Sequence, residues 1–321
     1  MTVLKTKSLG YDDVNLIAQP QNFLASRSLV PLELERIIVS PMAAVVGETF
    51  AIEAFSLGLS VCLHRFCKVE EQISIAKKLH SPTPHNKVWH SVGLNDMKSV
   101  EKILKASTSK PNILIDVANG YLRPVVDFAG NVKGLDCNVM AGNVHSMKGV
   151  EMYDHAGIPC SLRVGIGGGS VCKTSTVTGF TRGQITEIDE CAQYADDAAT
   201  HIYIVADGGI AGSGEALKAF GAGADYVMMG GYFSRAREAQ TVIDGKYAYW
   251  GGASWYQLTL NNKPQAHVEG DVKAVDKDYV QPLKTLVSFL WEGIASGVSY
   301  SGYNTLSRFI GNGVFEVKAN G

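Results

Sequence analysis

Features that mark several large classes of protein are missing from this sequence. Its six cysteines form no CxxC pair and have no regular spacing. In a long chain this pattern favours reduced thiols over a disulfide framework or a zinc site. No stretch approaches the roughly 18 apolar residues of a membrane span, and the first residues lack the apolar core of a signal peptide. We therefore expect a cytoplasmic protein that has no membrane partner.

Charge is also scarce. Charged residues make up 19% of the chain and the formal net charge is -2, so we expect no nucleic-acid partner and any phosphate must be bound locally. The 46% of hydrophobic residues and the 34 glycines favour a large core joined by tight turns. A length of 321 residues suits one large α/β barrel or two ordinary domains.

Short apolar runs recur along the chain, each followed by turn residues and then by a helical pattern. The runs are continuous, as expected of strands covered on both faces in a parallel sheet. The predicted strands are 36–41, 58–63, 88–92, 112–116, 138–141, 162–165, 202–206 and 226–229. The predicted helices are 49–56, 69–78, 97–106, 146–155, 183–197, 213–220 and, at the end, 281–295.

Strands and helices that alternate in this way predict an α/β fold, a (β/α)8 TIM barrel. A doubly wound sheet is the alternative, but no Gly-x-Gly-x-x-Gly follows the first strand. The interval 232–269 breaks the alternation with turn pairs and many aromatic residues. An insertion there would lie at the C-terminal mouth of a barrel, where active sites form. We predict one TIM-barrel domain over residues 1–321, with a mobile active-site flap at 232–269.

The run Gly-Ile-Gly-Gly-Gly-Ser-Val-Cys-Lys-Thr at residues 165–174 carries the strongest chemical signal. Its glycines let the backbone approach a ligand or an ion closely. The thiol of Cys172, with Thr174 two residues away, suits covalent catalysis at an electrophilic carbon. The alternative is that Cys172 is a small buried hydrophobe, as free cysteines usually are. The glycine context favours the nucleophile.

Glycine pairs follow the seventh and eighth predicted strands, as Asp207-Gly208-Gly209 and as Gly230-Gly231. Barrels often bind phosphate through backbone N–H groups of the loops after these strands. Ser170 can add a hydroxyl, and Asp207 can accept hydrogen bonds from a ribose diol. The alternative is that glycine pairs only make turns, but two pairs at these two positions favour phosphate binding.

Taken together, these motifs resemble the GMP reductases of the IMP dehydrogenase/GMP reductase barrel superfamily. The matching segments follow the family's order over most of the chain: 11–14, 116–121, 140–144, 167–174, 207–209, 219–225 and 230–231. The Asp-Val-Ala-Asn-Gly-Tyr run at 116–121 and the Ser-Val-Cys-x-Thr loop at 170–174 are the specific ones. The Ala-Gly-Ala-Asp pattern near residue 225 is shared by many barrels.

The resemblance implies an NADPH-dependent oxidoreductase that converts GMP, or a related purine nucleotide monophosphate, to IMP and ammonia. Cys172 would attack C2 of the purine and form a thioimidate, while Thr174 and Glu269 activate the thiol and protonate the leaving group. A carboxylate that orients a hydroxyl suits this proton transfer. Without the resemblance, Glu269 would be taken for a solvated loop carboxylate. Asp116 and Arg65 match residues near the reacting centre, although the family usually has lysine in place of Arg65.

The same resemblance extends to ligands and assembly. It implies a homotetramer, and a monovalent cation, potassium, held by carbonyls of Gly167, Gly169 and Cys172. The residues expected to contact the nucleotide are Ser170, Asp207, Gly208, Gly209, Gly230 and Gly231. No segment identifies the residues that bind NADPH, and the choice of NADPH over NADH rests on the resemblance.

The chain departs from the family where the purine base is recognised. Ala266-His267-Val268 replaces a segment that normally carries Arg and Ser, and Met42-Ala43-Ala44 replaces Met-Asp-Thr. Lost donors change which base is favoured, so the substrate remains open among GMP, dGMP and a modified purine nucleotide. One alternative is an IMP dehydrogenase without CBS domains, but residues 232–269 lack the Arg-Tyr pair with which the family activates water. The other is a catalytically silent purine-nucleotide-binding regulator.

Overall fold

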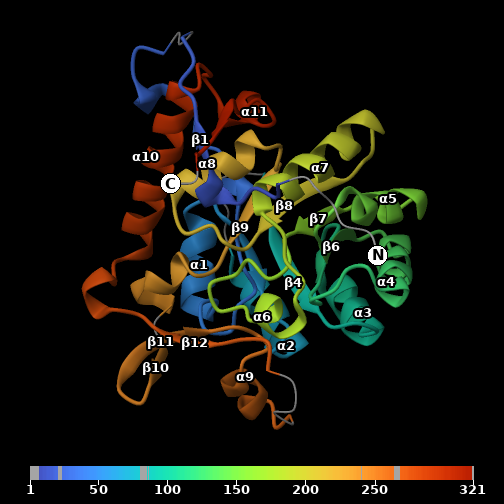
Figure 1. Cartoon of the computed structure of the whole chain (residues 1–321). Coiled ribbons are helices and arrows are strands. Elements are labelled where there is room, and N and C mark those ends of the chain that lie inside the picture. Colours follow the sequence, from blue (N-terminus) through green and yellow to red (C-terminus); the bar gives the residue numbers. More distant parts are fainter. Residues whose placement is uncertain are drawn as a thin grey trace.

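Eight parallel strands close on themselves into a barrel (Figure 1). The computed structural model describes residues 7–20, 24–79, 85, 87–239, 241–263 and 268–319. The barrel strands are β2 (Ile37–Val39), β3 (Ser60–Leu63), β4 (Val88–Val92), β5 (Asn112–Ile115), β6 (Asn138–Val144), β7 (Ser161–Val164), β8 (Tyr203–Asp207) and β9 (Tyr226–Met229). Pairing of β2 with both β3 and β9 closes the barrel. The predicted (β/α)8 TIM barrel is confirmed.

Helices surround the barrel on its outside (Figure 1). They are α1 (Glu48–Ser56), α2 (Val69–Lys78), α3 (Met97–Ala106), α4 (Arg123–Gly134), α5 (Met147–His155), α7 (Gln184–Asp197), α8 (Ser213–Gly221) and α10 (Leu283–Tyr300). Helix α4 was not predicted from the sequence. Its proline lies in the first turn, where no intrahelical N–H is needed, and Val125, Phe128 and Val132 are buried on one face.

Apolar side chains fill the inside of the barrel. Seven of the eight strands each contribute one residue to a buried interior cluster: Ile38, Cys62, Trp89, Leu114, Met140, Val205 and Met228. A larger cluster packs the other faces of the strands against the helices. The strands are therefore covered on both faces, which explains their continuous apolar sequence. Because the interior is packed, ligands must bind at an end of the barrel.

The segment after β9 contains a sheet of its own. Strands β10 (Thr241–Ile243), β11 (Lys246–Trp250) and β12 (Val272–Ala274) pair antiparallel, and α9 (Trp255–Leu260) lies between the last two in the chain. Asp244 and Gly245 both have positive φ and form the tight hairpin between β10 and β11. Tyr249 and Trp250 of this sheet pack against Ala44 and Val171. In Figure 1 this sheet and α9 lie at the same end of the molecule as α6 (Thr174–Thr178).

The remaining elements are short, and the chain ends pair with each other. β1 (Val14–Leu16) pairs antiparallel with β13 (Phe315–Val317). The other elements are η1 (Tyr11–Asp13), η2 (Arg27–Leu29), η3 (Leu34–Arg36), α6 (Thr174–Thr178), η4 (Phe233–Arg235), η5 (Arg237–Ala239), η6 (Lys277–Tyr279) and α11 (Leu306–Phe309). Among the helices in the described ranges, none combines the length and apolar character needed to cross a membrane.

Candidate active site

The loop that follows β7 brings Cys172 to the surface of a pocket. The other five cysteines are buried, whereas Cys172 is partly exposed. Burial raises the pKa of the Cys160 thiol to about 12, which makes such a thiol inert at neutral pH. Cys172 therefore differs from the buried apolar cysteines in its exposure, and its side chain lines a pocket of about 280 Å³.

A chain of hydrogen bonds runs from this thiol to a carboxylate. Sγ of Cys172 donates to Oγ1 of Thr174 over 3.3 Å. Oγ1 of Thr174 in turn donates to Oε2 of Glu269 over 2.9 Å. The directions of the two bonds allow a proton to leave the sulfur and reach the carboxylate through one hydroxyl. The residues predicted to cooperate are thus brought together across 95 positions of sequence.

Backbone contacts hold Glu269 next to the loop. The amide of Lys173 donates to the carbonyl of Glu269 over 2.7 Å, and the amide of Asp271 donates to Val171 over 2.8 Å. Cys172 also forms an antiparallel bridge with Gly270. An ion pair of 3.1 Å between Nζ of Lys173 and Oδ2 of Asp271 lies beside these bonds. The carboxylate is therefore a fixed part of the site and is not a freely solvated group.

Asp116 and Arg65 form an ion pair in the same pocket. Nε of Arg65 lies 3.2 Å from Oδ2 of Asp116. A second arginine, Arg163 of β7, approaches the other Asp116 oxygen at 3.4 Å and Asp207 at 3.7 Å. Arg163 is only 4% exposed, and it was not predicted from the sequence to belong to the site. The signal that could have found it is its place in an apolar strand, because a charged side chain buried there needs polar partners.

Asp207 is held at the end of β8 by polar neighbours. Nδ2 of Asn143 donates to Oδ2 of Asp207 and to the carbonyl of Gly165, both over 2.8 Å. Burial raises the pKa of Asp207, while Arg163 and Asn143 act in the opposite direction. A Cβ on Gly165 would overlap the Asp207 carbonyl oxygen, and its φ of +135° is one that glycine tolerates. These contacts bring the ends of β6, β7 and β8 together.

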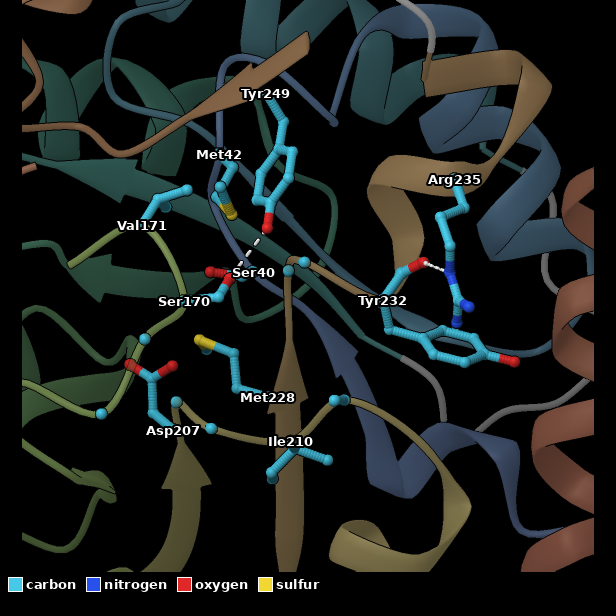
Figure 2. A pocket seen from close by; sticks show the side chains of 17 residues that line it. Ser40, Met42, Ser170, Val171, Asp207, Ile210, Met228, Tyr232, Arg235 and Tyr249 are labelled. Carbon is cyan, nitrogen blue, oxygen red and sulfur yellow. Dashed lines mark hydrogen bonds between the residues drawn. The ribbon is translucent and has the colours of Figure 1, made fainter. Parts of the chain in front are cut away.

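A second pocket, of about 350 Å³, contains all six residues predicted to contact a nucleotide (Figure 2). They are Ser170, Asp207, Gly208, Gly209, Gly230 and Gly231. The hydroxyl of Tyr249 lies 3.0 Å from that of Ser170, as Figure 2 shows. A Cβ on Gly231 would lie 2.9 Å from Oγ of Ser170, so glycine keeps this space open. Three further residues line the pocket and were not predicted from the sequence: Tyr232, Arg235 and Tyr249.

The two pockets are neighbours. Ser40, Met42, Gly168, Gly169, Asp207 and Gly208 line both of them. One pocket offers glycine backbone and hydroxyl groups, which suit an anion. The other offers a thiol, a hydroxyl and the ion pair of Arg65 with Asp116. A ligand with an anionic end and a ring can therefore span both.

Behind this site, Glu187 of α7 has a fully buried side chain. Burial raises the pKa of Glu187 to about 8, although Arg182 opposes the shift. Nδ1 of His145 lies 4.0 Å from the carboxyl, and Tyr11 and Glu190 also interact with it electrostatically. Between about pH 4.5 and pH 8, Glu187 therefore keeps its proton in the folded protein, whereas Glu187 of the unfolded chain loses it. Stability is expected to fall as the pH rises from about 4.5 to about 8.

The variant Glu187→Gln is expected to remove this contribution to the pH dependence. At pH 9 its free energy of unfolding should exceed that of the original protein, because no buried charge forms. Urea unfolding between pH 5 and pH 9 measures the slope of the free energy of unfolding against pH. Asp189→Asn, which changes an exposed carboxyl on the same helix, should leave the slope unchanged. An equal slope in Glu187→Gln and the original protein would contradict the assignment.

Known proteins resemble this chain along nearly its whole length. The family model described as "IMP dehydrogenase / GMP reductase domain" matches residues 8–320. The chain belongs to this family. It is 30% identical to GMP reductase 1 of Mus musculus over 88% of this chain and 90% of that protein. It is 30% identical to GMP reductases of Phytophthora infestans, over 94% and 88%, and of Vibrio vulnificus strain YJ016, over 93% and 90%.

Two expected departures from the IMP dehydrogenase/GMP reductase family fall in different parts of the structure. Ala266 and His267 lie outside the described residues, whereas Val268 precedes Glu269 beside the site. Met42 lines both pockets, and Ala44 packs against the sheet that follows β9. Met42 therefore lies between the ligand pockets and the hydrophobic core, and Ala44 lies beside the inserted sheet.

Proposed function

We propose that this protein is a GMP reductase, which converts GMP or a closely related purine nucleotide to IMP and ammonia at the expense of NADPH. The observation that carries the proposal is the chain of hydrogen bonds from Cys172 through Thr174 to Glu269, beside a glycine-lined anion pocket. The GMP reductases that the chain resembles support it. A protein that only bound nucleotides would need no such nucleophile.

In the first step, Sγ of Cys172 forms a bond to C2 of the purine. Its proton passes through Thr174 to Glu269, and the thiolate is the stronger nucleophile. Glu269 then returns the proton through Thr174 to the 2-amino group, the C2–N bond breaks, and ammonia leaves. The proton lost by the thiol is therefore the one gained by the leaving group. A thioimidate on Cys172 remains.

In the second step, the thioimidate is reduced. NADPH, when bound, supplies the hydride that adds to C2. The C2–S bond then breaks, IMP is released, and the Cys172 thiolate takes a proton from solvent. Phe66, Gly252 and Ala253 line the same pocket as Cys172, and this largely apolar wall fits a nicotinamide ring. We propose that Asp116 and Arg65, on the same pocket, orient the purine and the cofactor through their ion pair.

The test is the ratio of ammonia released to NADPH oxidised when purified protein meets GMP. We expect one ammonia per NADPH, with IMP as the product. The same assay with dGMP and with modified purine nucleotides identifies the preferred substrate. No turnover of any of these by folded protein would contradict the proposal, and production of NADH from IMP and NAD+ would favour a dehydrogenase.

We also propose that a potassium ion binds at the turn that holds Cys172. The amide of Cys172 donates to the carbonyl of Gly169 over 2.9 Å, which leaves a second lone pair on that oxygen. Carbonyls of Gly167, Gly169 and Cys172 would be the ligands, since carbonyl oxygens suit potassium. Turnover is expected to be faster in potassium than in sodium at equal ionic strength. Equal rates would argue against the site.

We further propose that residues 232–269 act as a mobile flap within a single TIM-barrel domain of residues 1–321. The flap supplies Tyr249 to the anion pocket and Glu269 to the thiol relay. Movement of the flap away from the barrel would separate Thr174 from Glu269 and interrupt proton transfer. GMP is therefore expected to slow proteolytic cleavage within this interval, and cleavage at an unchanged rate would contradict the proposal.

A further inference from the structure

Arg235 lies at one end of the anion pocket, where its guanidinium is held in a fixed position (Figure 2). Nε donates to the carbonyl of Tyr232 over 3.3 Å, and Cζ lies 4.5 Å from the centre of the Tyr232 ring. Tyr232 is only 8% exposed, and its hydroxyl donates to the carbonyl of Leu286 over 2.8 Å. The arginine therefore rests on an aromatic face that the final long helix holds in place.

The backbone around Arg235 is fixed as well. The amide of Gln281 donates to the carbonyl of Arg235 over 3.0 Å, and the amide of Arg237 donates to Gln281 over 2.8 Å. On the other side, the amide of Phe233 donates to Gly230 over 3.0 Å. The arginine is thus tied at short range to one of the glycines that form the anion pocket.

Among the residues that the structure describes, none is a hydrogen-bond or ion-pair partner of the tip of the Arg235 guanidinium. Within the described part of the chain, no acceptor hydrogen-bonds Nη1 or Nη2 of Arg235, and no carboxylate pairs with it. Of the described residues that line the pocket, only Asp207 is acidic, and it already interacts with Arg163 and Asn143. The remaining lining consists of glycine backbone, hydroxyl groups and apolar side chains. Arg235 therefore gives this end of the pocket an uncompensated positive charge and free donors.

We propose that Arg235 binds the phosphate dianion of the nucleotide and makes the enzyme select a nucleoside monophosphate over the nucleoside. The inference rests on the proposed function for the identity of the substrate. A guanidinium presents its donors in a planar fork that matches two phosphate oxygens. The glycine amides supply only partial charges, so Arg235 provides the full charge that the dianion requires.

The test compares Arg235→Ala with Arg237→Ala, which changes an exposed arginine two residues further on that does not line the pocket. A lost charge-assisted hydrogen bond corresponds to about 10-fold to 100-fold in affinity. We expect the KM for GMP to rise by about that factor in Arg235→Ala, with kcat nearly unchanged. Guanosine should be turned over equally by both variants, and Arg235→Lys should recover part of the lost affinity.

Binding of inorganic phosphate, measured by calorimetry, separates this inference from the proposed function. Arg235→Ala should bind phosphate at least about 10-fold more weakly than Arg237→Ala, whether or not GMP is a substrate. Equal affinity for phosphate in the two folded variants would overturn the role of Arg235 and leave the proposed function intact. Weaker phosphate binding by Arg235→Ala than by Arg237→Ala, together with no turnover of any purine nucleotide by the original protein, would overturn only the proposed function. Circular dichroism and thermal unfolding confirm that both variants fold.

Discussion

Replacing Cys172 with alanine will abolish turnover and leave nucleotide binding intact. The loss should be on the order of 10^4-fold or more, because the reaction has no other group that can form the covalent intermediate. Affinity for IMP should change little, since the anion pocket is built from Ser170 and the glycines after β8 and β9. NADPH oxidation measures the first effect and calorimetry the second.

Cys160→Ala is the matched control for this variant. Cys160 is 5% exposed and burial raises its pKa to about 12, so its removal should leave turnover unchanged. Persistent activity in Cys172→Ala would rule out the covalent mechanism. A nucleotide-binding regulator would be supported if the original protein showed no turnover and the Cys172→Ala variant kept its biological effect.

The variant Glu269→Gln is expected to lower kcat by about 10^2-fold to 10^4-fold. A glutamine amide can still accept a hydrogen bond from Thr174, but it cannot take up the thiol proton or return it to the leaving amine. The KM for GMP should change much less than kcat. Steady-state rates with GMP and NADPH give both values.

Two further variants make this prediction specific. Asp271→Asn alters a partly exposed carboxylate two residues away that pairs with Lys173, and it should retain most of the activity. Thr174→Val interrupts the same relay as Glu269→Gln, so the double variant should lose little more than either single variant. Additive losses in the double variant would mean that the two residues act separately.

Much of the barrel could be predicted because its strands are buried on both faces. Runs such as Ile113 to Ile115 are continuous and apolar, and this composition identifies them without structural information. Helix α4 was missed because Pro124 and two glycines obscure its apolar face. The sheet β10–β12 was missed because β10 and β12 have no buried residue and so lack the continuous apolar run of a barrel strand. β12 also pairs with β11 across the intervening segment that contains α9.

The candidate site shows the same division between local and distant information. Cys172 and Thr174 are two residues apart, so their spacing alone indicated cooperation. Glu269 lies 95 residues from Thr174, and the resemblance to a family identified it where spacing could not. Arg163 was missed because its partners, Asp116 and Asp207, lie at the ends of other strands of the barrel. Arg235 was missed because only the folded chain shows that it lines a pocket. Neither arrangement follows from a local motif, because both depend on the closed barrel.

The most direct measurement is the mass of the Cys172 peptide after the protein is mixed with GMP in the absence of NADPH and quenched in acid. If Cys172 forms the thioimidate, this peptide gains the mass of GMP less ammonia, and the corresponding peptide of Cys172→Ala protein gains nothing. An unmodified Cys172 peptide in protein that oxidises NADPH with GMP would contradict the account, as would an adduct on a different cysteine.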